Sequence, residues 1–136
     1  EVRAGTSTSA KELEEEIKYT EFVIQETTGS TTKYFRPPKA WLRTGEKIKI
    51  KSMGYEVVLW SVNSKDWVPF SHERIVRFLL HRVKGGDILL FHDSGAVLKS
   101  EGGDRSQTVL AVPAMARALR EKGFEFVTLE ELLHEQ

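Results

Sequence analysis

Apolar and polar positions follow two different periods in the first half of the chain. Residues 9–28 (SAKELEEEIKYTEFVIQETT) repeat apolar side chains every three to four positions, which predicts an amphipathic helix. Residues 31–35 (TTKYF) and 55–60 (YEVVLW) are rich in β-branched and aromatic side chains, which is typical of strands. The intervening residues 44–53 predict a short helix with Thr44 as its N-cap.

The middle of the chain continues the alternation. A polar loop, residues 61–67, precedes a helix that Ser71 caps and that has apolar residues on one face. Residues 86–93 (GDILLFHD) contain four consecutive apolar residues between turn signals, which predicts a strand buried on both faces. Residues 94–107 are polar and rich in glycine, so we expect a long loop.

The last third predicts a helix, a strand and a short helix. The helix extends to about Lys122, but Pro113 leaves two alternatives open. Either residues 109–112 are extended and the helix begins near Pro113, or the helix is kinked there, because an internal proline removes a backbone hydrogen bond. Residues 124–128 (FEFVT) predict a fourth strand, and residues 129–134 a final helix.

The regular alternation of helices and strands predicts an α/β fold with a parallel sheet, in one domain covering residues 1–136. Four strands are too few to close a barrel, which needs about eight. Twenty basic and twenty acidic residues cancel, so nothing points to nucleic acid as a partner. The chain has no cysteine, which excludes disulfides and thiolate metal sites.

Three predicted strands are each followed by a polar group next to a proline or an aromatic residue. These groups are Arg36 before two prolines, Asp66 before Trp67, and His92 after Phe91. Because the carboxyl ends of parallel strands share one edge of a sheet, Arg36, Asp66 and His92 can converge there. A histidine at that edge can act as an acid or a base near neutral pH. The competing interpretation is a generic α/β domain in which these residues only cap and pack.

Five stretches, in this order, resemble the polysaccharide deacetylases, the NodB homology domains of carbohydrate esterase family four. The stretches are FRPP, GYEVVLWSVNSKDW, GDILLFHD, DRSQT and KGFEFVTLEELL, and the resemblance covers about residues 9–136. The resemblance implies the parallel-stranded part of a distorted (β/α) barrel. It also implies a hydrolase that uses one divalent metal to remove N-acetyl or O-acetyl groups from chitin-like chains, peptidoglycan or xylan.

The resemblance also implies roles near the two prolines. Arg36 would hold a catalytic-base aspartate, and the backbone N–H of Lys39 would help form the oxyanion hole. Pro38 and Lys39 would therefore lie at the substrate. The stretch Lys39-Ala40-Trp41 differs from many relatives, which have an aromatic residue and a glycine after the prolines.

The other two strand ends receive the remaining roles from the resemblance. His92 would be the general acid that protonates the leaving amine, and Asp66 would contact His92. Trp67 would line the sugar groove, and Leu90 would bound the pocket for the acetyl methyl group. In this assignment Arg36, Asp66 and His92 are the catalytic set, while Pro38, Lys39, Trp67 and Leu90 bind substrate.

The family's aspartate pair and its His-x-x-x-His metal ligands have no counterpart in this chain, whose four histidines are not spaced for a shared site. We therefore expect the C-terminal portion of a deacetylase domain, inactive by itself. The divalent metal, expected to be zinc, and the partner N-terminal portion would lie outside this chain. A divergent domain without metal, or a non-catalytic glycan-binding module, is the alternative. The substrate class implies an extracellular or cell-envelope location.

Overall fold

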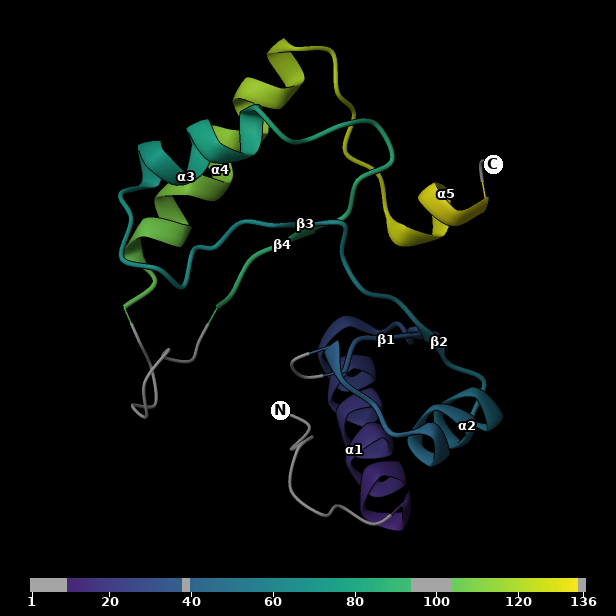
Figure 1. Ribbon diagram of the computed structural model, residues 1–136. Helices are drawn as coiled ribbons and strands as arrows, with labels where there is room; N and C mark the ends of the chain where they lie inside the picture. The colour runs from purple at the N-terminus through teal and green to yellow at the C-terminus, as the bar shows by residue number, and fades with distance from the viewer. Residues whose placement is uncertain (1–9, 38–39, 94–103, 135–136) are drawn as a thin grey trace. The chain divides into compact units, whose positions relative to one another are not determined.

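The computed structural model describes residues 10–37, 40–93 and 104–134. The chain divides into two compact units, Glu1–Leu59 and Trp60–Gln136 (Figure 1). Each unit combines helices with one pair of short parallel strands. The fold is therefore of the α/β class, as the sequence predicts.

The first unit contains two helices and two strands, in the order α1 (Ala10–Thr28), β1 (Tyr34–Phe35), α2 (Thr44–Ser52) and β2 (Glu56–Val57). The strands pair in parallel, with Tyr34 opposite Glu56 and Phe35 opposite Val57. The core of this unit is formed by buried apolar side chains from both helices and the loop between them: Leu13, Ile17, Leu42 and Ile50.

The start of α2 differs from the prediction by one residue. Arg43, not Thr44, is the N-cap, and its backbone N–H donates to Glu46 Oε2 at 2.7 Å. The glutamate three residues into the helix therefore satisfies a backbone donor that would otherwise lack an acceptor. Thr44 becomes the first helical residue.

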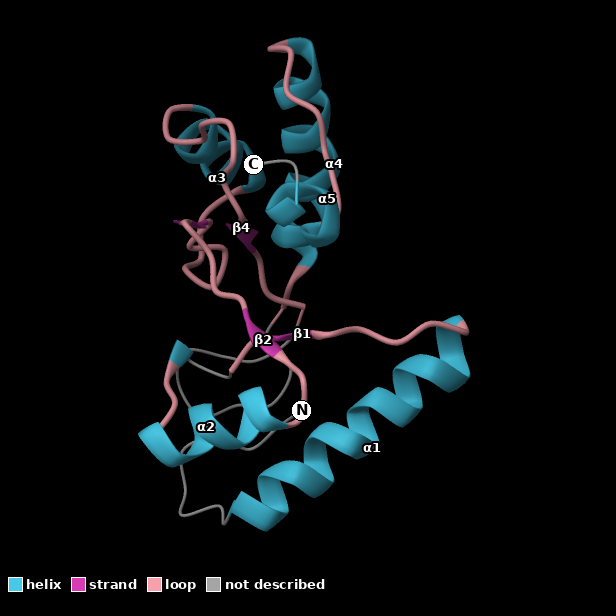
Figure 2. Ribbon diagram, turned by 90° about the vertical axis from the view of Figure 1, so that its right-hand side faces the viewer, coloured by secondary structure: helices cyan, strands magenta, loops and turns pink. Residues whose placement is uncertain are grey.

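The second unit contains β3 (Val62–Asn63), α3 (His72–Leu80), β4 (Leu89–Leu90), α4 (Ser106–Glu121) and α5 (Leu129–His134). The two strands pair in parallel, with Val62 opposite Leu89 and Asn63 opposite Leu90 (Figure 2). Strand β3 lies in the stretch that the sequence predicts as a loop. Its residues do not form an apolar run, so tertiary pairing with β4 creates the strand where local propensity does not.

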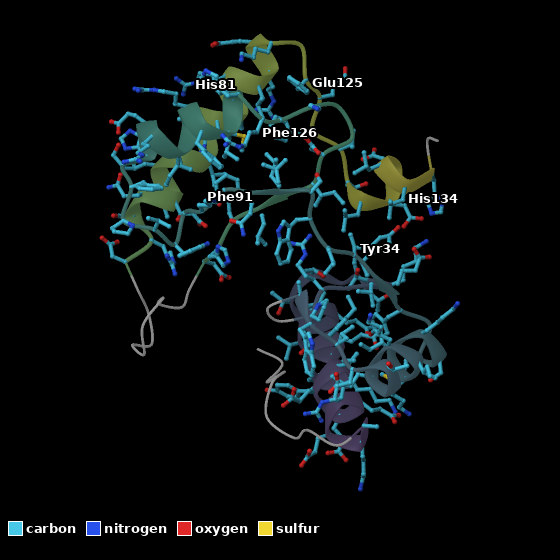
Figure 3. The ribbon with its side chains drawn as sticks, in the orientation of Figure 1. Tyr34, His81, Phe91, Glu125, Phe126 and His134 are labelled. Carbon is cyan, nitrogen blue, oxygen red and sulfur yellow. The ribbon has the colours of Figure 1, made fainter. Side chains whose placement is uncertain are left out.

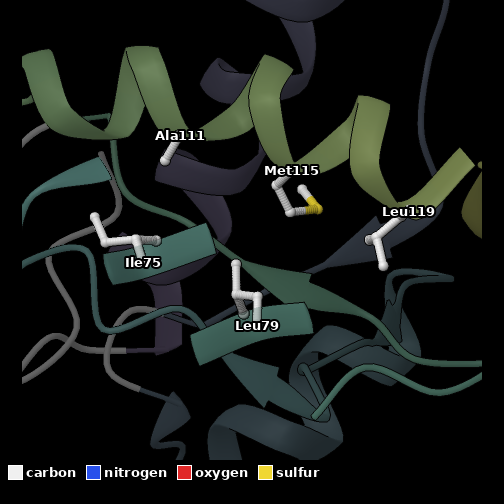
Figure 4. Packing of buried hydrophobic residues seen from close by; sticks show 5 residues of the cluster. All are labelled: Ile75, Leu79, Ala111, Met115 and Leu119. Carbon is white, nitrogen blue, oxygen red and sulfur yellow. The ribbon is translucent and has the colours of Figure 1, made fainter. Parts of the chain in front are cut away.

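Helices α3 and α4 pack against each other and form the core of the second unit (Figure 4). Ile75 and Leu79 lie one turn apart on α3, and Ala111, Met115 and Leu119 repeat at the same interval along α4. Residues four apart share one helix face, so each helix presents a single apolar stripe to the other. Burying a side chain such as Leu79 stabilises the fold by about 1.5–3 kcal/mol.

Helix α4 runs without interruption through Pro113, so the alternative in which the helix begins near Pro113 is wrong. Proline leaves the carbonyl of Val109, four residues earlier, without its helical donor. Val109 and Pro113 both lie on the exposed face of α4, where water can take the place of that donor. Packing on the opposite face holds the helix together.

Two strand predictions are wrong for the described residues. Residues 124–128 form no strand, and Phe126 and Val127 are about half exposed, because no neighbouring strand pairs with them within the described ranges. In the run of four apolar residues around β4, only Leu90 is buried, while Ile88, Leu89 and Phe91 are half-buried. The expected burial on both faces is therefore not found for this strand.

Candidate active site

The ends of β3 and β4 bring Asp66 and His92 together. The Ser64 N–H donates to the Leu90 carbonyl at 3.1 Å, which extends the pairing one step beyond Asn63. Asp66 follows two residues later, and His92 stands two residues after the end of β4. Parallel pairing of two strand ends thus explains why residues 26 positions apart meet.

A tight turn after β3 directs the side chains of Ser64 and Asp66 into the protein. The Asn63 side-chain oxygen accepts a hydrogen bond from the Lys65 N–H at 2.8 Å. This hydrogen bond closes a type of turn that asparagine favours. Lys65 has a φ of 56°, in the left-handed region, which costs a residue with a side chain about 1–2 kcal/mol. Ser64 and Asp66, on either side of Lys65, are both buried.

The Asp66 carboxylate accepts four hydrogen bonds from three residues. Its Oδ1 accepts from the His92 ring Nδ1 at 2.7 Å and from the Ser64 hydroxyl at 2.9 Å. Its Oδ2 accepts from the His92 backbone N–H at 2.8 Å and from the Thr108 hydroxyl at 2.9 Å. The Asp66 side chain is completely buried. Because buried charges need such partners, this set of donors accounts for an ionised carboxylate inside the fold.

The pKa of Asp66 reflects two opposing effects. Burial raises the pKa, because it disfavours the charged form. The hydrogen bonds from His92, Thr108 and Ser64 together lower the pKa by more than burial raises it. The net result is a pKa below the usual value of 3.8. Asp66 is therefore ionised at neutral pH.

The contact with Asp66 fixes which nitrogen of His92 carries a proton. An ionised carboxylate can only accept hydrogen bonds, so Nδ1 of His92, 2.7 Å away, must be the donor. In the neutral imidazole the other nitrogen, Nε2, is then an acceptor, and in the imidazolium it is a second donor. The His92 side chain is one-third exposed, so the ring is accessible to a ligand.

A cavity of about 470 Å³ lies beside His92. It is formed by the residues that follow β4 and by the first half of α4: Phe91, His92, Asp93, Arg105, Thr108, Val109 and Val112. Figure 3 shows Phe91, which lines this cavity, directly after β4. His81, at the end of α3, does not line it. The candidate acid thus borders a space in which a small group can be held.

The other predicted site residues have different positions. Trp67 follows Asp66 and is 38% exposed, while Leu90 in β4 is buried. Arg36 belongs to the first unit, where its Nε and Nη2 donate to the carbonyls of Val58 and Leu59 at 3.3 and 3.2 Å. Pro38 and Lys39 lie outside the described residues.

The other histidines have separate contacts. The His72 ring contacts Gln107, with 3.3 Å between Nδ1 and Oε1, and the His81 Nδ1 lies 2.6 Å from the Arg77 carbonyl. Within residues 10–37, 40–93 and 104–134, no group of three or more histidine, aspartate or glutamate side chains is placed to hold a metal ion. The described residues therefore do not fit a metal centre of their own.

The sequence did not identify Ser64 and Thr108 as site residues. The signal for Thr108 is its position, because it falls on the buried stripe of α4 that otherwise consists of apolar residues. A hydroxyl on such a stripe indicates a buried polar partner. Ser64 gives no comparable signal, because it lies in a largely polar stretch that is predicted to be a loop.

No family model matches the chain, but comparisons with individual proteins find relatives. The chain is 39% identical over 101 residues to a peptidoglycan-N-acetylglucosamine deacetylase from Bacillus cereus, a match that covers 73% of the chain and 44% of the relative. It is 30% identical over 132 residues to a bifunctional xylanase/deacetylase from Pseudobutyrivibrio xylanivorans, which covers 93% of the chain and 19% of the relative.

Two solved structures share the fold. A family 4 carbohydrate esterase from Streptomyces lividans superposes with a TM-score of 0.70 at 29% identity, over 87% of this chain and 56% of that one. A CE4 family pseudoenzyme from Bacillus anthracis gives 0.77 at 22% identity, over 95% and 42%, a similarity that supports the fold alone.

The described helices are neither long nor apolar enough to cross a membrane. The chain spans less than half the length of the two curated relatives. The sequence matches and the shared fold indicate the same family. The chain belongs to the polysaccharide deacetylases, the NodB homology domains of carbohydrate esterase family four.

Proposed function

We propose that this chain is the C-terminal portion of a metal-dependent deacetylase domain. The domain removes N-acetyl, or O-acetyl, groups from a polysaccharide such as peptidoglycan or a chitin-like glycan. The observation that carries the proposal is the 2.7 Å hydrogen bond between His92 and the buried Asp66, at a strand end beside a cavity. This chain supplies the proton-donating and sugar-binding part of the site.

His92 is the general acid of the reaction. Hydrolysis of an N-acetyl group requires a proton for the amine, which is a poor leaving group when it departs as an anion. Asp66 holds Nδ1 of the imidazolium, so the transferable proton is the one on Nε2. That proton passes to the amide nitrogen as the C–N bond breaks, and His92 is left as the neutral imidazole.

The remaining residues bind and orient the substrate. Trp67 is 38% exposed and provides an aromatic ring for stacking against a sugar, and Leu90 bounds the space for the acetyl methyl group. Lys39 contributes its backbone N–H to the oxyanion hole, and Pro38 lies next to it at the substrate. Arg36 holds the catalytic-base aspartate, which lies outside this chain.

The complete domain contains a divalent metal, zinc in our proposal, which activates water and polarises the acetyl carbonyl when bound. Its ligands come from an N-terminal portion of the same domain, which is the partner of this chain. Exposed Phe126 and Val127 support this, because a strand-like segment with half-exposed apolar residues is suited to pairing with a further strand. By itself the chain is inactive. The polymeric substrate places the protein at the cell envelope or outside the cell.

Acetate release tests this proposal. The complete domain, loaded with zinc, is incubated with N-acetylated chito-oligosaccharides and with peptidoglycan, and free acetate is measured. We expect activity that His92→Ala reduces by about 10²–10⁴-fold. His134→Ala, which changes an exposed histidine on α5, is the matched control and keeps full activity. Saccharide binding without acetate release would instead identify a non-catalytic glycan-binding domain.

A further inference from the structure

The stretch Asp104–Thr108 (DRSQT) opens α4, and the proposed reaction gives it no role. Its last two residues form hydrogen bonds that connect α4 to the start of α3 and to Asp66. Gln107 Oε1 accepts from the His72 N–H at 2.8 Å, at the start of α3. The Thr108 hydroxyl donates to Asp66 Oδ2 at 2.9 Å. Adjacent residues of α4 thus contact the start of α3 and the turn after β3.

Thr108 lies at a buried position, where a hydroxyl without a hydrogen-bond partner would destabilise the fold. Thr108 is 7% exposed and shares the buried face of α4 with Ala111, Met115 and Leu119. A hydroxyl in such a position is costly unless it is hydrogen-bonded. Threonine in a helix often bonds a carbonyl of its own preceding turn, but Thr108 donates instead to a side chain 42 residues away.

The four donors are divided equally between the two Asp66 oxygens. Oδ2 accepts from Thr108 and the His92 backbone, and Oδ1 accepts from the His92 ring and Ser64. Without Thr108, Oδ2 would keep only one partner, and the carboxylate could rotate away from the plane that aligns Oδ1 with the imidazole. Thr108 therefore limits the orientation of the group that orients His92.

We propose that Thr108 is a positioning residue, which fixes the Asp66 carboxylate so that His92 keeps its proton on Nδ1 and presents Nε2 to the substrate. The inference rests on the proposed function of His92, and it assigns the DRSQT stretch to the alignment of the general acid. The charged and titratable groups that border the Asp66–His92 pair are Asp93 after β4 and Arg105 at the start of α4. Ser64 and Thr108 supply the neutral donors.

Carbon-13 and nitrogen-15 NMR of the labelled full chain measure both consequences directly. The Asp66 carboxyl carbon reports its pKa, and the His92 ring nitrogens report which of them carries the proton. Thr108→Val removes the donor at similar volume, so we expect a higher Asp66 pKa and a smaller fraction of His92 protonated at Nδ1. Thr108→Ser keeps the hydroxyl and restores both values.

Gln107→Ala is the matched control for general loosening of α4. It removes the acceptor for the His72 N–H without touching Asp66, so stability falls but the Asp66 pKa stays at the wild-type value. An unchanged Asp66 pKa in Thr108→Val, or an equal rise in Gln107→Ala, would overturn the proposal. If Thr108→Val does not fold, Thr108→Cys replaces it, because a thiol is a weak donor of similar size. A cysteine variant that matches the serine variant would overturn the proposal as well.

Kinetics of the complete domain separate this inference from the proposed function. Thr108→Val lowers kcat/KM for acetate release by about 10- to 100-fold, an effect typical of a slightly misplaced catalytic group, and Thr108→Ser restores it. If the wild-type domain releases no acetate, the proposed function fails, while the NMR titration still decides whether Thr108 positions Asp66 and His92.

Discussion

Replacing Asp66 with alanine tests how much the buried carboxylate contributes to the fold. The substitution removes the acceptor of four hydrogen bonds, two from His92 and one each from Thr108 and Ser64. The two hydroxyls can rotate toward other acceptors, whereas the His92 backbone N–H cannot. We therefore expect the main cost at His92.

The magnitude follows from these contacts. An unsatisfied buried donor costs about 1–3 kcal/mol, and removing one partner of a buried charged pair costs about 3–5 kcal/mol. The variant no longer has to desolvate a carboxylate, which offsets part of this loss. We predict that Asp66→Ala lowers the free energy of unfolding at pH 7 by about 3 kcal/mol.

Urea unfolding followed by tryptophan fluorescence measures this change. Trp60 and Trp67 belong to the second unit, whereas Trp41 belongs to the first and is half exposed, so the series is made in a Trp41→Phe background. With a slope of about 1–3 kcal/mol per molar urea, the midpoint falls by at least about 1 M. Asp93→Ala, which removes an exposed carboxylate next to His92, is the control.

Surface substitutions of this kind usually change stability by less than about 0.5 kcal/mol. If Asp66→Ala is no more destabilising than Asp93→Ala, the hydrogen bonds to Asp66 do not hold the two loops, and the reasoning is refuted.

Three further predictions concern acid stability, the core and sugar binding. A carboxyl whose folded pKa lies below its unfolded value stabilises the fold above that unfolded value, 3.8, and the contribution is lost as pH falls through the folded pKa. Urea midpoints of the wild type therefore decrease on acidification below about pH 4, and those of Asp66→Asn decrease less. Leu79→Ala, in the α3–α4 core, lowers the free energy of unfolding by about 2–5 kcal/mol, whereas the exposed Val109→Ala changes it by less than about 0.5 kcal/mol. Trp67→Ala weakens saccharide binding in calorimetry by about 0.5–1.5 kcal/mol with little change in the urea midpoint, and unchanged affinity would remove Trp67 from the groove.

The helices could be predicted well from the sequence because their signals are local. Gly29 takes a φ of +71° at the end of α1, as expected for a glycine after a helix, and α5 has the predicted bounds. Strands were predicted less well, because a strand exists only where a partner pairs with it. Residues 124–128 have strand-like side chains without a partner among the described residues, and Val62–Asn63 have a partner without a strand-like pattern.

The residues of the candidate site also differ in how far the sequence predicts their positions. His92 could be placed because it follows the predicted strand that contains β4, but the strand that Asp66 follows, β3, lies in a stretch predicted as a loop, so the pairing that brings the two residues together was not predicted. Thr108 could not be predicted in this way, since its contact depends on how α4 docks against the two loops. The expected role of Arg36 stays a prediction, because the hydrogen bonds of its side chain among the described residues go to the carbonyls of Val58 and Leu59.

The dependence of the His92 effect on the leaving group is the most direct test of whether His92 is a general acid. An N-acetyl amine needs a proton to leave, whereas the phenolate of an activated aryl acetate leaves without one. In the complete domain, we predict that His92→Ala lowers kcat/KM for an N-acetylated chito-oligosaccharide by about 10²–10⁴-fold. The same substitution should change kcat/KM for 4-nitrophenyl acetate by less than about tenfold. An equal loss on both substrates would contradict the assignment of His92 as the proton donor.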